Sequence, residues 1–422
     1  MYLSRYRKLA LVCVLSFFAL NVLAQDTVTS AGVEQKSYQL YQDKNWPELI
    51  KYGNMAINKG IDYFYLQLRV GIAYYEKKNY SLAEDHFKSA LKFNSGDELT
   101  EEYLYYCYLY LGRYEEARKL SNQFDAVLAK KLGTDVMSPV GMVIVEGGTK
   151  IADSSSYYNS HNLNKPNYFD PAAYFQIGLT HYVHNKASVF HAATYFNQQS
   201  FLGTNRQLQY YLKAAIPVKK NWLIVPAFQW VNKKNTTETK PPPPNPMHMG
   251  PPPRPETIIT KSNNFVGSIE IQKTIKRLQL SLGTTVTKWD TTMQYIHSGS
   301  FSYYVFGNSK LVIGASAYLH TINNYSTVNT AVAPFVFVQP AKFVSVTASY
   351  LSNSGQNIVE GNGYLVNNSP DLTSSRWSFL VNFAISKHLS LYGLYQLEYK
   401  QEAVQRFYYY YNVIVGGIKI TP

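Results

Sequence analysis

The fold is decided by stretches such as Leu278-Gln279-Leu280-Ser281-Leu282-Gly283-Thr284-Thr285, in which apolar and polar side chains alternate. The leucines share one face with Thr284, and the residues between them share the other. A strand with one apolar and one polar face is half buried. The same period of two recurs at 208–216 and at 377–385, and no long helix separates the copies. The pattern therefore predicts an antiparallel sheet.

We expect about fourteen strands of this kind. They are predicted at 141–150, 172–184, 187–199, 206–217, 222–233, 261–275, 278–288, 293–306, 311–322, 328–339, 343–353, 373–386, 389–400 and 406–420. The long links, 151–171, 234–260 and 354–372, all follow odd-numbered strands and so share one rim, while the links at the other rim are short. Short turns at one rim and long loops at the other are typical of an outer-membrane barrel.

A closed barrel is also the form in which this chain can enter a membrane. After the first two dozen residues, no window approaches the roughly 18 unbroken apolar residues that a transmembrane helix needs, so strands must satisfy the backbone in lipid. Tyrosines at 303–304 and 408–411 stand near predicted strand ends, where amphipathic rings suit the membrane interface. A soluble sandwich is the alternative, although fourteen strands with three long loops on one rim would be unusual for it.

The first residues have the layout of a cleavable export signal. Three basic residues (Arg5, Arg7 and Lys8) precede an apolar run, and Val22-Leu23-Ala24 supplies a cleavage site. Residues 1–24 are therefore predicted to be a signal peptide. Cys107 is then the only remaining cysteine, which excludes an intramolecular disulfide.

Charge is divided unevenly. Residues 25–135 hold 16 acidic and 14 basic side chains, whereas residues 136–422 hold 11 acidic and 23 basic ones, a net charge of +12. A basic surface favours anionic partners such as lipopolysaccharide phosphates. Nucleic acid is not expected as a partner, because the chain is predicted to carry an export signal.

An interval of thirty-four residues runs through the N-terminal part, where Trp46, Tyr80 and Tyr114 each follow a polar residue. Helix pairs are predicted at 31–59, 63–93 and 97–129. The small and aromatic residues expected to pack the pairs together are Trp46, Gly71, Tyr74, Tyr80, Ala83, Phe87, Ala90, Tyr108, Tyr114 and Ala117. We thus expect an α + β chain of two domains: a helical solenoid at 25–132, a linker at 133–140 and an antiparallel transmembrane barrel at 141–422.

Fourteen strands are enough to leave an aqueous lumen unless something fills it. By parity, the charged residues expected to face the lumen are Glu146, Lys150, Lys213, Glu270, Arg376, Glu398 and Lys400. Mixed charges of this kind can form a constriction. The alternative is that they are water-facing residues without a selective role.

The longest loop contains the proline-rich stretch 240–255, which is expected to be extended polyproline. Its Met247-His248-Met249 is too small a cluster to predict a metal site. Histidines at 181, 184, 191, 297 and 320 fall in predicted strands, but no serine elbow, metal-ligand spacing or glycine-rich phosphate loop accompanies them. We therefore expect no metal, no cofactor and no catalytic site, with a barrel lipid hydrolase as the enzymatic alternative.

The thirty-four-residue pattern resembles tetratricopeptide repeats, whose concave groove holds partner proteins. The whole architecture is similar to exopolysaccharide-export porins and, more loosely, to YaiO-like outer-membrane proteins, although its repeat domain is much shorter than that of the export porins. The resemblance implies an outer-membrane pore or export channel, for polysaccharide or protein, with a periplasmic arm that docks a partner protein. A non-conducting anchor for a cell-envelope complex is the alternative.

Overall fold

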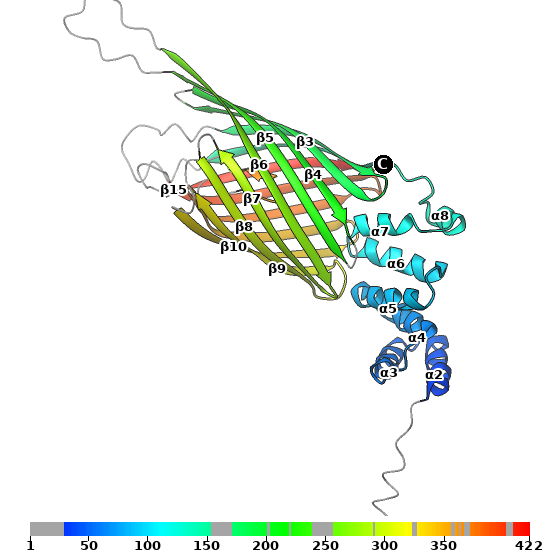
Figure 1. The fold of residues 1–422 in the computed structure, drawn as a ribbon. Coiled ribbons are helices and arrows are strands. Elements are labelled where there is room, and N and C mark those ends of the chain that lie inside the picture. The colour runs from blue at the N-terminus through cyan, green and yellow to red at the C-terminus, as the bar shows by residue number, and fades with distance from the viewer. Residues whose placement is uncertain are drawn as a thin grey trace, which may run out of the picture.

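The computed structural model describes residues 29–152, 171–200, 203–218, 221–238, 256–289, 292–322, 327–355, 359–362, 364–366, 372–401 and 408–422. Within these residues, seven helices are followed by a closed barrel of fourteen antiparallel strands (Figure 1). The predicted signal peptide and the proline-rich stretch 240–255 lie outside the described residues.

Each strand of the barrel pairs with its neighbours in sequence, and β1 closes the ring against β16. The strands are β1 (Val140–Ala152), β2 (Ala172–Val183), β3 (Ala187–Ser200), β4 (Gly203–Pro217), β5 (Trp222–Glu238), β6 (Thr257–Ile275), β7 (Leu278–Trp289), β8 (Thr292–Tyr304), β9 (Leu311–Ile322), β10 (Thr327–Ala341), β11 (Val344–Gly355), β14 (Leu372–Ala384), β15 (Leu389–Gln401) and β16 (Tyr408–Ile420). The prediction of fourteen strands is confirmed. Two further short strands, β12 (Val359–Glu360) and β13 (Leu365–Val366), form a separate hairpin that was not predicted.

The pleat gives the barrel two chemically different faces. Leu282 lies opposite Ile271, and these side chains are 72% and 44% exposed on the outer face. The neighbouring pair, Ser281 and Gln272, points into the barrel. Because successive side chains in a strand alternate between faces, the period of two in the sequence becomes an apolar exterior and a polar interior.

Tyrosines near the strand ends divide between these faces. Tyr408 and Tyr410 are 46% and 40% exposed on the outer face, whereas Tyr409 and Tyr411 are buried inside. The expectation that all four rings of 408–411 lie at the membrane interface is therefore wrong for two of them. The reason is the pleat itself, which sends adjacent residues of one strand to opposite faces.

The helices precede the barrel and stack at one of its ends (Figure 1). They are α2 (Ser30–Gln42), α3 (Trp46–Asn58), α4 (Phe64–Glu76), α5 (Tyr80–Phe93), α6 (Glu98–Tyr110), α7 (Tyr114–Ser121) and α8 (Ala126–Leu132). Three of them start at a side-chain cap: Thr29, Asp97 and Asp125 accept backbone N–H groups of α2, α6 and α8. Of the helices that the structure describes, none has the length and apolar character needed to span a membrane. We call α2 to α8 the helical arm.

Small residues allow close approach in the core of the helical arm. Ala83, Ala90 and Phe87 are fully buried. A Cβ on Gly71 would come within 2.6 Å of the Phe87 ring, so glycine is needed for α4 to approach α5. Among the other residues expected to pack the helix pairs, Trp46 contacts Tyr41, Tyr74 stacks on His86 and Tyr80 stacks on Tyr110, while Tyr108 and Ala117 are buried and Tyr114 is 56% exposed. The expected third pair, 97–129, is instead α6, a short α7 and the start of α8.

Phe87→Ala should destabilise the helical arm by about 3–5 kcal/mol, because it removes a fully buried ring and leaves a cavity. The matched control is Phe93→Ala on the same helix, whose ring is 52% exposed. Hydrogen exchange of α4 and α5 measures both changes. Equal effects of the two variants would contradict the assignment of Phe87 to the core.

Candidate functional site

The lumen is lined by amide and aromatic side chains. Gln209 donates to Gln207 at 3.0 Å, Gln229 donates to Gln209 at 3.1 Å, and Gln279 donates to Gln272 at 2.7 Å. These residues alternate with the exposed apolar residues of the same strands, so they face inward. A connected set of neutral donors and acceptors covers this part of the wall.

The hairpin β12–β13 folds inward from the link between β11 and β14. Its Asn362 carbonyl accepts from Ser268 on β6 at 2.9 Å and from Tyr211 on β4 at 3.2 Å, and Tyr364 bonds Gln176 on β2. In the ring order, β4 and β6 each lie six strands from β14, in opposite directions around fourteen strands. The hairpin therefore reaches across the lumen to the far wall. We call residues 359–362 and 364–366 the inward hairpin.

An ion pair anchors the first strand of the inward hairpin to β14. Arg376 Nη2 donates to both carboxylate oxygens of Glu360, at 2.7 and 2.6 Å. Both side chains are nearly buried, so little water competes with the pair. At the other side of the hairpin, Val359 packs against Val266 and Ile296 of the wall.

Four of the seven predicted lumen residues come together around this anchor. Lys400 Nζ lies 3.4 Å from Glu398 Oε2, while Lys150 Nζ and Arg376 Nη1 each lie 4.0 Å from a carboxylate oxygen of Glu398. With Glu360, the cluster holds three cations and two carboxylates. Charge attraction across β1, β14 and β15 thus stabilises the position from which the hairpin starts.

The other three predicted lumen residues lie apart from this cluster. Glu146 accepts from Gln176 at 3.0 Å and from the hydroxyl of Tyr392. Glu270 accepts from Gln272 at 2.5 Å, and the Lys213 ammonium lies 5.9 Å from the Phe190 ring centre. Glu146 is linked through Gln176 to Tyr364, so it supports the tip of the inward hairpin.

No pattern in the sequence indicated that Glu360, Tyr364, Tyr211 and Gln176 would be partners. Glu360 and Tyr364 fall in the link 354–372, which was expected to be an outer loop. A local signal does exist in the turn, where Gly361 and Asn362 both have a φ of 59°. Glycine and asparagine are the residues that tolerate this conformation, but their presence does not show which way a loop folds.

The helical arm rests on the short-turn rim of the barrel. Ser81 N donates to Gly307 O at 3.0 Å, Asn308 donates to Lys78 O at 2.8 Å, and Ser309 donates to Tyr110 O at 3.1 Å. Further along, Arg118 on α7 donates to Asn185 at 2.8 Å, and its guanidinium lies 3.6 Å from the Tyr182 ring centre. The arm therefore contacts turns on several strands of one rim.

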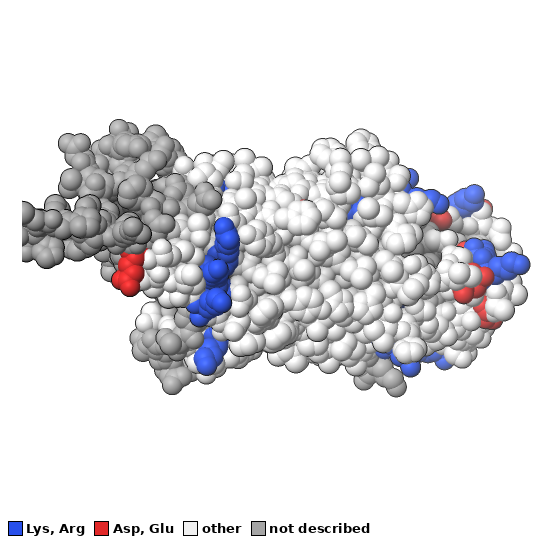
Figure 2. Space-filling view, turned by 90° about the horizontal axis from the view of Figure 1, so that it is seen from above, with Lys and Arg blue, Asp and Glu red and all other residues white. Residues whose placement is uncertain are grey.

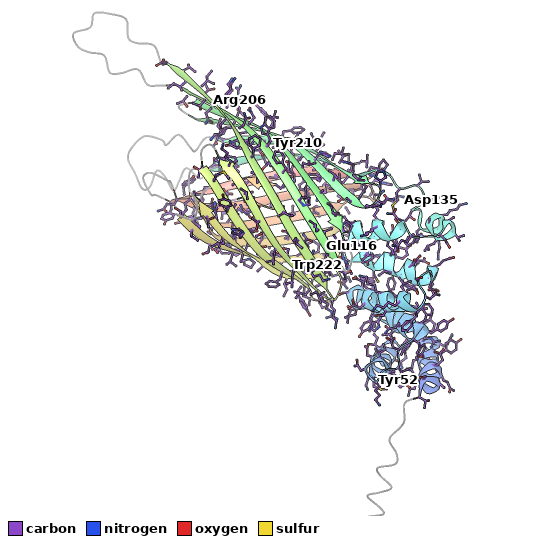
Figure 3. The ribbon with its side chains drawn as sticks, viewed as in Figure 1. Tyr52, Glu116, Asp135, Arg206, Tyr210 and Trp222 are labelled. Carbon is purple, nitrogen blue, oxygen red and sulfur yellow. The ribbon has the colours of Figure 1, made fainter. Side chains whose placement is uncertain are left out.

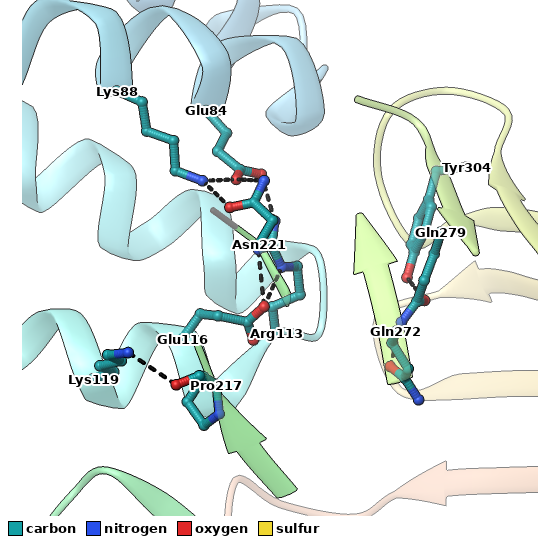
Figure 4. Close-up of polar contacts among 10 residues, drawn as sticks. All are labelled: Glu84, Lys88, Arg113, Glu116, Lys119, Pro217, Asn221, Gln272, Gln279 and Tyr304. Carbon is teal, nitrogen blue, oxygen red and sulfur yellow. Dashed lines mark hydrogen bonds and ion pairs between the residues drawn. The ribbon is translucent and has the colours of Figure 1, made fainter. Parts of the chain in front are cut away.

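A buried ionic group forms the centre of this contact (Figure 4). Glu84 accepts from Arg113 at 2.7 Å, from Lys88, and from Asn221 of the β4–β5 link at 3.2 Å. Arg113 also bonds Glu116 at 2.9 Å. Burial opposes ionisation of Glu84, but Arg113 and Lys88 outweigh burial and hold the pKa of this carboxyl below its usual value.

A cavity of about 210 Å³ separates this group from the lumen wall. It is lined by Arg113 and Glu116 from the arm and by Gln272, Gln279 and Tyr304 from the barrel. In Figure 3, Glu116 and Trp222 lie at the barrel end that carries the helices, and Arg206 lies toward the opposite end. The helical arm thus lies over the mouth of the lumen at the short-turn rim.

Gly307→Ala should loosen the helical arm from the rim by about 1–3 kcal/mol, because a Cβ at this position would collide with Asn79 Oδ1 and φ is +68°. Gly60→Ala is the matched control: its φ is +87° and a Cβ there would meet nothing within 4 Å. Limited proteolysis of the arm measures the difference. Equal cleavage rates in the two variants would show that the close contact does not matter.

His86 gives the arm a dependence on pH. Burial lowers the pKa of this imidazole to about 4, and its Nδ1 lies 2.7 Å from Gln67 Oε1. The unfolded chain takes up a proton near pH 6.5, so stability from the neutral ring is present above that pH and is lost as pH falls from 6.5 to about 4. The loss should reach about 3 kcal/mol. Hydrogen exchange of α5 should show a shallower pH dependence in His86→Gln over this interval, and an unchanged dependence would contradict the role of His86.

The histidines of the barrel lie on different faces and contact different partners. His181 and His191 stack on the outer face at 4.9 Å, and His191 lies 2.6 Å from the Tyr210 hydroxyl. His320 faces inward, 3.0 Å from Gln294 Oε1. His184 lies in the turn after β2 and not in a strand as predicted, because β2 ends at Val183. No group of three metal-binding side chains occurs in the part of the chain that the structure describes, and Met247-His248-Met249 lies outside it.

No protein-family model and no curated protein matches this chain. Among solved structures, the CymD monoaromatic hydrocarbon channel is similar at 7% identity and a TM-score of 0.43, covering 68% of this chain and 89% of its own. A Pseudomonas aeruginosa FadL homologue has 8% identity and a TM-score of 0.40, covering 67% and 90%, and a bacterial polysaccharide outer membrane secretin has 8% and 0.37, covering 68% and 100%. All three TM-scores are below 0.5, so the substrates of those proteins are not assigned to this chain.

Proposed function

We propose that this chain is an outer-membrane channel for polar solutes, with a helical arm that docks a partner protein at its inner mouth. The observation that carries the proposal is the closed ring of fourteen strands with an apolar outer face and a polar inner face. A closed barrel with this pattern satisfies its backbone in lipid and keeps a wet interior.

The direction across the membrane follows from the two rims. Short turns occupy the rim that binds the helical arm, and the long links lie at the other rim. Outer-membrane barrels have short periplasmic turns and longer outer loops. These two features support a periplasmic position for the helical arm. Protease added to intact cells should not cleave the helical arm. Cleavage of the arm under these conditions would contradict the proposed orientation and favour the opposite one.

The lining favours an uncharged, hydroxyl-rich solute such as a polysaccharide. Neutral amides and tyrosine hydroxyls donate and accept hydrogen bonds without imposing a charge. The ionic cluster around Glu398 has most of its charge paired internally. A folded protein is a poor match, because the inward hairpin crosses the lumen.

The helical arm supports the docking part of the proposal. Its pairs α2–α3, α4–α5 and α6–α7 carry small and aromatic residues at the thirty-four-residue interval, and Gly71, Ala83 and Phe87 fill the positions that tetratricopeptide repeats use for packing. We take the arm to be a short array of such repeats. Its exposed aromatic residues, including Tyr38, Tyr65 and Tyr110, remain available to a periplasmic protein.

Planar-bilayer recording of the full-length protein tests this function. We expect steady but small conductance with weak ion preference, because the lumen is polar and is crossed by the inward hairpin. Addition of an uncharged oligosaccharide should reduce the current, whereas hydrocarbon or free amino acids should not. Absence of current in repeated reconstitutions would remove the channel proposal.

A non-conducting anchor is the second candidate, and the inward hairpin is the observation that favours it. If the hairpin fills the lumen completely, the barrel serves only to hold the helical arm at the membrane. The chain would then retain its periplasmic partner and show no current. We propose a transport or docking role, and not an enzymatic one, for either candidate.

A further inference from the structure

Three cations stand side by side on the outer face of the barrel. Arg206 on β4 lies directly opposite Lys234 on β5, and Lys234 lies directly opposite Lys261 on β6. Arg206 and Lys261 are exposed and Lys234 is partly exposed. Their inner neighbours Gln207 and Ser262 face the lumen, so all three cations point outward. We call these three residues the basic ladder.

The positive charges of the basic ladder are not neutralised by carboxylates of the described residues. Like charges directly opposite on neighbouring strands repel each other and destabilise the pair. No carboxylate among the described residues forms an ion pair with any of the three. An external anion would remove this repulsion.

Below the basic ladder, successive layers of outward-facing side chains on β4, β5 and β6 differ in chemistry. The next outward layer is Leu208, Asn232 and Asn263, in which Asn232 donates to Asn263 at 2.9 Å. The layer after that is aromatic: Tyr210 and Phe265 are 39% and 44% exposed, with Trp230 between them. From the rim inward along the strands, the outer face thus presents cations, then amides, then aromatic rings. This order matches the headgroup, the interface and the acyl chains of a lipid.

The cations occupy one sector of the barrel. Figure 2 shows a row of Lys and Arg near the end with the long links, with an acidic patch beyond it toward that end and a largely uncharged expanse on its other side. Lys288 on β7, opposite Phe265, extends the sector. In the other described strands, Lys150, Arg376 and Lys400 at this end point into the lumen. The outward charge is therefore confined to β4 to β7.

We propose that the basic ladder is a binding site for a phosphate-bearing lipid headgroup of the outer leaflet, and specifically for a lipid with two phosphates. This site is separate from the lumen, and its placement in the outer leaflet rests on the orientation proposed above. Three cations in adjacent strands match more than one phosphate, and the apolar and aromatic layers below accept the acyl chains of the same molecule. A soluble anion would use the cations alone.

The test compares two triple variants of the full-length protein in detergent. Arg206→Gln, Lys234→Gln and Lys261→Gln together remove the basic ladder. Lys310→Gln, Lys342→Gln and Lys387→Gln together remove three exposed cations from the short-turn rim. Native mass spectrometry with diphosphoryl lipid A as the probe measures binding. We expect about hundredfold weaker binding in the ladder variant and no change in the rim variant.

Four outcomes decide the proposal. Weaker binding of monophosphoryl lipid A to the wild-type protein supports it, and so does a roughly fivefold loss of lipid binding when the exposed Lys261 alone is changed to Gln. Equal lipid binding by the ladder variant overturns it. Inorganic pyrophosphate that binds as tightly as the lipid also overturns it, because the acyl layers would then contribute nothing. Bilayer conductance of the ladder variant should equal that of the wild type, so a failed channel and a failed lipid site give different results.

Discussion

Replacing the inward hairpin, residues 359–366, by a short Gly-Ser link should raise the single-channel conductance about threefold or more. The hairpin bonds wall positions on β2, β4, β6 and β14, so it occupies part of the cross-section of a lumen that fourteen strands would leave open. Planar-bilayer recording measures the change. The barrel strands do not depend on the hairpin, since β11 and β14 pair with each other directly.

A point variant distinguishes the effect of the hairpin's presence on the current from the effect of its anchoring to β14. Arg376→Gln removes the guanidinium that holds Glu360, so the hairpin should fluctuate and the current should become noisy at a higher mean level. Lys288→Gln is the control, because it removes one positive charge from the outer face. If neither the replacement nor Arg376→Gln changes the current, the hairpin does not limit the path.

Glu84→Ala should destabilise the docked helical arm by about 3 kcal/mol. The change leaves Glu116 as the one carboxylate paired with the buried Arg113, and it removes one of the arm's two side-chain bonds to Asn221 of the barrel, the other being that of Lys88. Burying a charge without its partner is costly. Hydrogen exchange should rise in α5 and α7 while the barrel strands keep their protection.

Lys131→Gln is the control for this change. Its side chain is 59% exposed, and its ion pair with Glu102 should be worth less than about 1 kcal/mol. If Glu84→Ala leaves exchange in α7 unchanged, the buried ionic group does not hold the arm. If exchange rises in the barrel as well, the arm and barrel unfold together.

Alternation predicted most of the barrel because it is a local property of each strand. The ends of β5 and β6 were missed: the predicted segments 222–233 and 261–275 lengthen to Trp222–Glu238 and Thr257–Ile275. The added residues, such as Lys234, Asn235 and Thr236, carry no apolar alternation. They pair through backbone hydrogen bonds between the two strands, and the pattern of side chains does not predict such bonds.

The site was harder to predict because it depends on contacts between distant parts of the chain. Parity selected Arg376, Glu398 and Lys400, since a strand residue faces either inward or outward. Parity does not apply to a loop, so Glu360 and Tyr364 carried no signal. The docking of the arm was missed for a similar reason: several of its bonds use backbone atoms of turns, such as Gly307 O, whose position no residue type reveals.

The contact between helices and turns also orders the events of biogenesis. The arm is synthesised first, yet its seat is made of turns that belong to strands from β2 to β9. Those turns come together only when the strands from β2 to β9 have paired. The seated arm therefore marks a barrel wall that has assembled at least this far, and a protein that recognises the arm in this position would engage only such copies.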